Sequence, residues 1–175
     1  MFQVKGIFQA ALAPLTALAV AGSIFGATAG SAGAVAQPVI MTAPESQLMA
    51  ELNADRAANG EGPLAGNGVL AGIARQRSQM IAASGNFTHY AADGSLVFAG
   101  MLNGIAFPYS FAGENLAENN YSWPVSLDEA NTQLMNSPTH RANILSPKYN
   151  EVGIGIAGPT PDGKFYYTQI FAAAW

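Results

Sequence analysis

Residues 137–155, SPTHRANILSPKYNEVGIG, contain the change of pattern that decides the fold. The segment 139–145 predicts a short helical turn, and the alternation of apolar residues over 150–157 predicts a strand. The turn sequence GPTPDG follows at 158–163, and KFYYTQIFAAA at 164–174 is rich in the β-branched and aromatic residues that strands prefer. The end of the chain therefore predicts an antiparallel hairpin.

Two helices are predicted in the first half of the chain. The segment 45–60 places Leu48 and Leu52 on one helical face, and its Asn-Gly end is a stop signal. A second helix is predicted over 69–84, where apolar residues recur at helical spacing, and Gly85 follows it as a C-cap.

A third helix is predicted to begin at Ser126. Ser126 and Glu129 have the spacing of a capping box, and Pro138 ends the segment. Helices that precede a terminal hairpin indicate an α+β domain with separate layers.

Two segments are predicted to lack regular structure. Residues 37–44 carry a proline near each end and read as an extended linker. Residues 86–124 are rich in glycine, asparagine and aromatic residues, and a loop of that length in a compact domain is often functional.

Residues 1–36 have the pattern of a secretory signal peptide. A single charge, Lys5, precedes an apolar stretch over 7–25, and small residues end in A-V-A at 34–36. An uncleaved membrane anchor is the alternative, but Pro14 interrupts the stretch. We therefore expect a secreted protein that is not stably inserted in a membrane after cleavage.

The composition excludes several classes of site. The chain has 175 residues and no cysteine, which excludes disulfides, thiolate metal sites and a thiol nucleophile. After residue 36, six basic residues face eleven acidic ones, a net charge of −5 without a basic run, so we expect no nucleic-acid partner. The G-x-G-x-x-G sequence at 153–158 lies in a predicted strand with prolines after it, which excludes a dinucleotide-binding loop.

The histidines of this chain are His89 and His140, and Glu114 is the carboxylate in the sequence between them that we consider with them. Such residues can hold a divalent metal, act as general acid and base, or form a hydrogen-bonded network that fixes loops. The spacing alone leaves these three alternatives open.

The chain resembles the CAP superfamily (cysteine-rich secretory proteins, antigen 5 and pathogenesis-related protein 1; SCP-like domains), and in particular its cysteine-free bacterial branch. The matching pieces keep their order over residues 45–175. They are LNADRAANGEGPL at 52–64, GNFTHY at 85–90, GENLA at 113–117, MNSPTHRANILSPKYNEVGIG at 135–155 and YYTQIFA at 166–172.

The resemblance implies an α-β-α sandwich with a small antiparallel sheet between helical layers and a large cleft. It also implies a tetrad of two histidines and two glutamates, which holds zinc or another divalent ion in some members. By position, His89, Glu114 and His140 match three of the four, so the resemblance implies that His140 faces His89 across the cleft. Ser137 stands where the fourth glutamate is expected, so a metal site here would have three ligands and an open position.

Three functions follow from these expectations. The favoured one is a secreted binding protein for a lipid, a glycan or a cell-wall component, or for a protein partner, with a possible metal at His89, Glu114 and His140. The second is a hydrolase in which Ser137 or a metal-bound water attacks, His140 or His89 acts as base and Glu114 orients it. The third is a structural interaction domain. We lean away from an enzyme, because no nucleophile lies in a recognised motif.

Overall fold

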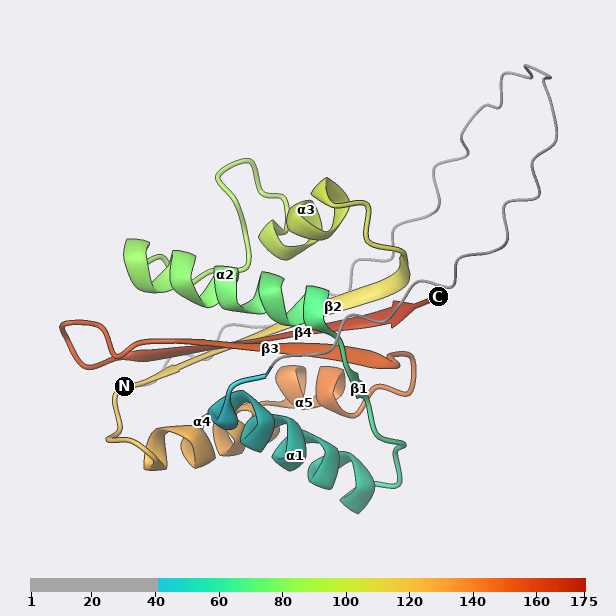
Figure 1. Cartoon of the computed structure of the whole chain (residues 1–175), viewed down its shortest axis with the longest axis horizontal. Helices are drawn as coiled ribbons and strands as arrows, with labels where there is room; N and C mark the ends of the chain where they lie inside the picture. The colour runs from blue at the N-terminus through green and yellow to red at the C-terminus, as the bar shows by residue number, and fades with distance from the viewer. Residues whose placement is uncertain (1–40) are drawn as a thin grey trace, which may run out of the picture.

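The structure, a computed structural model, describes residues 41–175; the predicted signal peptide and residues 37–40 of the predicted linker lie outside this range. The sheet lies between α2 and α3 on one side and α1, α4 and α5 on the other (Figure 1). This arrangement confirms the predicted α+β fold with helical layers on both faces of a sheet. The elements are α1 (Ala43–Ala58), β1 (Ala65–Gly66), α2 (Gly68–Ser84), α3 (Val97–Gly104), β2 (Tyr109–Asn119), α4 (Val125–Asn136), α5 (Pro138–Ile144), β3 (Glu151–Ala157) and β4 (Phe165–Ala174).

The sheet has the strand order β1-β3-β4-β2. The predicted hairpin is confirmed, because β3 and β4 pair antiparallel, and β2 pairs antiparallel with the other edge of β4. The sheet is nevertheless mixed and not purely antiparallel, since β1 joins β3 in parallel. A strand of two residues is too short to show any periodicity, which is why the sequence pattern did not reveal it.

The prediction of a loop over 86–124 was wrong. This segment contains α3 and the whole of β2, whose register with β4 runs from Tyr109 opposite Ala174 to Asn119 opposite Phe165. The strand forms despite its glycine and asparagines because a long partner strand is available, and strand formation depends strongly on such context.

Two helix starts also differ from the prediction. Helix α1 begins at Ala43 and not at 45, with Thr42 as N-cap and Glu45 completing a capping box, and Pro44 fits in the first turn where no N–H is needed. Ser126 is not a cap, because α4 starts at Val125 and Ser126 is buried inside it. Its hydroxyl donates to Asn119 Oδ1 and hydrogen-bonds to the hydroxyl of Tyr167, so it joins α4 to β2 and β4.

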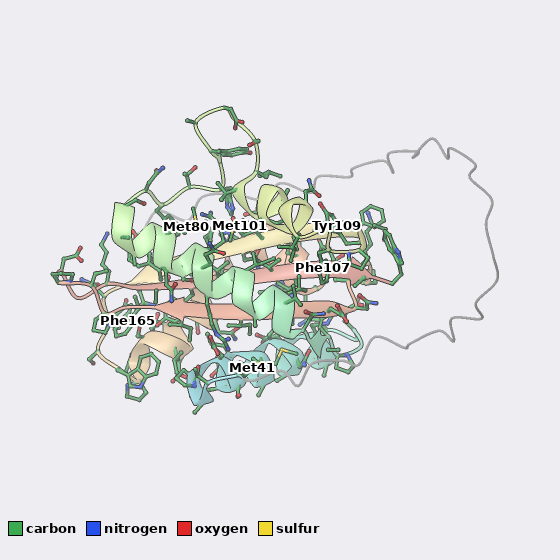
Figure 2. All side chains as sticks on the ribbon, turned by 45° about the horizontal axis from the view of Figure 1, so that its top comes forward. Met41, Met80, Met101, Phe107, Tyr109 and Phe165 are labelled. Carbon is green, nitrogen blue, oxygen red and sulfur yellow. The ribbon has the colours of Figure 1, made fainter. Side chains whose placement is uncertain are left out.

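Apolar side chains fill both sides of the sheet. The larger cluster packs between the sheet and α1, α4 and α5, and it includes Phe165, with Met41 against it. A second cluster packs between the sheet and α2 and α3, with Met101 and Phe107 against it. Figure 2 shows these labelled side chains on their respective sides. Within residues 41–175, no helix combines the length and apolarity needed to cross a bilayer.

Helix α2 lies unusually close to β3. A Cβ atom added to Gly153 would lie 2.1 Å from the carbonyl carbon of Leu70, and one added to Gly155 would lie 2.1 Å from the backbone nitrogen of Arg75. Glycine therefore lets the helix backbone rest directly on the strand. This contact explains the G-x-G sequence and confirms that it is not a nucleotide-binding loop.

Acidic side chains meet where α1 packs on α4. Gln47 Nε2 donates to Glu51 Oε1 at 2.8 Å and to Asp128 Oδ1 at 3.1 Å. Burial raises the pKa of Glu51; the Gln47 hydrogen bond opposes this, and the charges of Asp128 and Asp55 add to it. The neutral form of Glu51 is therefore more favoured in the folded protein than in the unfolded chain.

We expect Glu51→Gln to stabilise the protein at neutral pH. Ionised Glu51 is unfavourable above its raised folded-state pKa, and this penalty is absent below the unfolded value of ~4.3. The amide removes the charge, so the free energy of unfolding should rise by ~0.5 kcal/mol at pH 7, allowing for solvent screening. Thermal unfolding of both proteins at pH 7 and about pH 3.5 measures this. A gain that is equally large at the lower pH would contradict it.

Candidate functional site

Glu114 is the centre of the candidate site. It lies in the middle of β2 and its side chain is fully buried on the α2 side of the sheet. Arg77 of α2 meets it with two nitrogens: Nε lies 2.7 Å from Oε1 and Nη2 lies 3.3 Å from Oε2. The side chain of Arg77 is only 3% exposed, so this is a buried ion pair with a two-pronged geometry.

His89 joins the same carboxylate from the segment that follows α2. Its Nδ1 lies 2.8 Å from Glu114 Oε2, and the ring is 4% exposed. Arg77 Nη2 also donates to the carbonyl of Thr88 at 2.8 Å, which ties the same segment to α2. We call these three residues the Arg77–Glu114–His89 cluster. In it, one carboxylate orients a guanidinium and an imidazole.

His140 approaches β2 from the other side of the sheet. Glu114 and Asn115 are consecutive in β2, so their side chains point to opposite faces. Asn115 Nδ2 donates to the carbonyl of His140 at 3.1 Å, and Asn143 Nδ2 donates to Asn115 Oδ1 at 3.0 Å. The backbone of His140 thus belongs to the buried α5 side, whereas His89 belongs to the α2 side. We predicted that the two histidines face each other across one cleft, but these contacts do not show that arrangement.

Ser137 also lies away from the cluster. It occupies the junction between α4 and α5, where its hydroxyl hydrogen-bonds to that of Thr139 at 3.1 Å. This junction is on the α5 side of the sheet, and the cluster is on the α2 side. The serine nucleophile that we considered is therefore not placed beside His89 and Glu114.

The predicted metal ligands His89, Glu114 and His140 are not gathered into a three-ligand group in the structure of residues 41–175. Across residues 41–175, no group of three or more His, Asp or Glu side chains is arranged to hold a metal ion. Both oxygens of Glu114 already accept hydrogen bonds from Arg77, and Oε2 is also next to His89 Nδ1. Arg77 and His89 thus occupy the Glu114 carboxylate, which counts against a divalent cation bound to this carboxylate.

A groove lies beside the cluster, with a volume of about 530 Å³. Arg77 contributes to its wall, and Thr88 and Tyr90 come from the segment that carries His89. Its remaining lining comes from the second half of α2, the segment after it and the start of α3. These residues are Met80, Ile81, Ala83, Ser84, Asn86, Ala91, Ala92 and Val97.

The sequence analysis missed the role of Arg77. A signal was present, because Arg77 falls among the apolar positions of its helix, in step with Ile73, Ala74 and Ile81, which are all buried. Arginine is almost never fully buried without a partner. An arginine on an apolar helix face therefore indicates a buried hydrogen-bond acceptor elsewhere in the chain, which for Arg77 is the Glu114 carboxylate.

Known proteins share this fold and part of this sequence. The uncharacterized protein YkwD of Bacillus subtilis (strain 168) is 30% identical over 118 residues, which are 67% of this chain and 44% of YkwD. An extracellular protein containing an SCP domain from Bacillus anthracis str. Ames matches at a TM-score of 0.62 and 23% identity, over 74% of this chain and 40% of its own. The chain thus spans less than half the length of these two proteins.

An outer surface protein from Borrelia burgdorferi matches over 78% of this chain and 97% of its own, at a TM-score of 0.63 and 17% identity. A structure of NaASP2 with Zn²⁺ shares the fold at a TM-score of 0.53 and 10% identity, over 77% of this chain and 82% of its own. At these identities the likeness shows the fold alone.

The cysteine-rich secretory protein family, CAP, has a family model that matches residues 49–171. These residues include α2, β2, β3 and most of β4, and with them all three members of the Arg77–Glu114–His89 cluster. The family match and the shared fold agree with the resemblance found in the sequence. The chain belongs to the CAP family, as a member without cysteine.

Proposed function

We propose that this protein is a secreted binding protein whose groove beside the Arg77–Glu114–His89 cluster takes a small amphiphilic ligand. The groove has the size of a small-molecule site, and most of its lining is apolar. A lipid-like body suits this lining better than a glycan does, because a glycan would need more polar partners. Methionine adapts its shape to different apolar ligands, and Met80 is 43% exposed in the groove.

The observation that carries the proposal is the position of Arg77 in the groove wall. Its Nε and Nη2 are used by Glu114 and Thr88, whereas Nη1 has no hydrogen-bond partner among residues 41–175. A guanidinium nitrogen at an apolar groove can receive the oxygen of a ligand head group. A carboxylate head group would gain the most, since charge-assisted hydrogen bonds are the strong ones.

The hydrolase alternative receives less support. His89 and Glu114 have the geometry of an oriented base, but Ser137 is at the α4–α5 junction on another part of the molecule. If the cluster served only to stabilise the fold, the groove would bind no ligand. The experiment below separates this role from binding.

We expect the purified protein to bind a fluorescent fatty-acid analogue with a free carboxylate, and Met80→Glu to weaken this binding at least tenfold. The new carboxylate places a like charge in the groove and disrupts its apolar wall. Fluorescence titration measures the dissociation constant. Because Met80 is exposed, the substitution should leave the unfolding temperature almost unchanged.

Val69→Glu is the matched control for this test. Val69 lies on the same helix and is 44% exposed, but it does not line the groove. Its dissociation constant should equal that of the wild type. An analogue in which an alcohol replaces the carboxylate should bind more weakly to the wild type and to Val69→Glu. No saturable binding, or equal loss in both variants, would contradict the proposed function.

A further inference from the structure

Arg77 supplies a positive charge at Glu114, one of the residues for which the resemblance in the sequence implies a metal ion. A divalent ion at this cluster would need lone pairs from the Glu114 carboxylate and from the His89 ring. In this chain the guanidinium lies on both carboxylate oxygens, at 2.7 and 3.3 Å, and His89 Nδ1 is directed at the same carboxylate. The Glu114 carboxylate and His89 Nδ1 are thus engaged with each other, and the carboxylate is also engaged with Arg77.

The charges of Glu114 and Arg77 balance each other without an ion. Glu114 and Arg77 are 1% and 3% exposed, so water can screen neither of them effectively. A buried carboxylate requires a cationic partner, and arginine provides one that cannot lose its proton in a protein. The third contact of Arg77, to the Thr88 carbonyl, holds the segment before His89 in the same arrangement.

We propose that Arg77 is a permanent substitute for a metal ion in this CAP protein, and that it positions Glu114 and His89 without any divalent cation. The site is then independent of metal supply and insensitive to chelators. The proposal does not depend on which ligand the groove takes. It makes Arg77 a positioning residue, and it predicts that the same pocket becomes a metal site when position 77 supplies a ligand in place of a cation.

Arg77→His is the variant that tests this. The Nε2 atom of a histidine is as many bonds from Cα as the Nε atom of arginine, so the new imidazole can approach Glu114 Oε1, where Arg77 Nε now lies 2.7 Å away. Together with His89 and Glu114 it would complete a set of two histidines and one glutamate, a set that binds zinc.

The measurement is calorimetric titration of tag-free protein with zinc chloride, with thermal unfolding in zinc and in EDTA. The wild type should show no zinc binding that depends on His89, and its unfolding temperature should be the same in both solutions. The Arg77→His variant should bind one zinc ion and unfold at least ~5 °C higher in zinc than in EDTA. Adding His89→Ala to it should abolish both effects.

Arg75→His is the matched control, because Arg75 lies on the same helix and pairs with a different carboxylate, Glu45. It should gain no zinc binding. Wild-type zinc binding that His89→Ala abolishes would overturn the proposal, and so would a folded Arg77→His variant that binds no zinc. If that variant folds only when zinc is added, the proposal is supported. If Arg77→His does not fold at all, the zinc titrations of the wild type and of His89→Ala alone decide whether the proposal holds.

Discussion

Replacing Gly153 with alanine is expected to lower the free energy of unfolding by at least about 3 kcal/mol. This is the upper end of what overpacking usually costs, because the contact here is with rigid backbone. The added Cβ atom would lie 2.1 Å from the carbonyl carbon of Leu70 and 2.2 Å from the nitrogen of Ala71. Both are backbone atoms of α2, so no side chain can turn aside. The helix itself must move away from the sheet, and its buried contacts with β3 and β4 must change.

Urea unfolding measures this effect, and Gly72→Ala on the same helix is the control. A Cβ atom at Gly72 meets nothing within 4 Å, and alanine is the better helix former, so this variant should be more stable than the wild type by about 0.5–1 kcal/mol. If Gly153→Ala and Gly72→Ala had the same stability, α2 would not lie as close to β3 as the structure indicates.

Glu114→Gln is expected to destabilise the protein by about 3–5 kcal/mol, the usual cost of removing one partner of a buried ion pair. The amide has nearly the shape of the carboxylate but leaves the guanidinium of Arg77, 3% exposed, without its counter-charge. His89 loses the same charged acceptor. Chemical denaturation of the single variant gives the size of the effect.

A double variant shows whether the charge is the cause. Arg77→Met combined with Glu114→Leu removes both charges, and apolar replacement of a whole buried pair is often close to neutral. We expect it to be more stable than Glu114→Gln alone. The Arg75–Glu45 pair provides the comparison: because the side chain of Arg75 is 32% exposed, Glu45→Gln should cost only about 1 kcal/mol. Equal losses at Glu45 and Glu114 would show that burial of Arg77 is not what makes its pair important.

The parts of the fold that were predictable are those with a strong local pattern. The hairpin followed from alternating residues around a turn, and the end of α2 followed from Gly85, which has the left-handed φ of +67°. Strand β2 was not predictable, because its stability comes from β4, some fifty positions later in the chain. The start of α4 was misplaced because Ser126 uses its hydroxyl for tertiary contacts and not for a cap.

The candidate site was predictable only in part, for a geometric reason. His89 and Glu114 were recognised by resemblance, and the structure places them in contact. His140 was recognised in the same way, but a motif in the sequence does not say which face of the sheet its residues will occupy. Arg77 has no motif, and its role depends on a carboxylate 37 residues away.

The side chains of Glu114 and Asn115 point to opposite faces of the sheet, and this also restricts the register in which β2 can pair with β4. A slip of one residue against β4 would exchange the faces of all its side chains. The Glu114 carboxylate would then meet the carbonyl of His140, where Asn115 now donates a hydrogen bond, and Arg77 would lose its counter-charge. Two apolar neighbours could tolerate such an exchange, but an acceptor facing an acceptor cannot. These two adjacent residues therefore select one alignment of the strand and penalise its nearest competitors during folding.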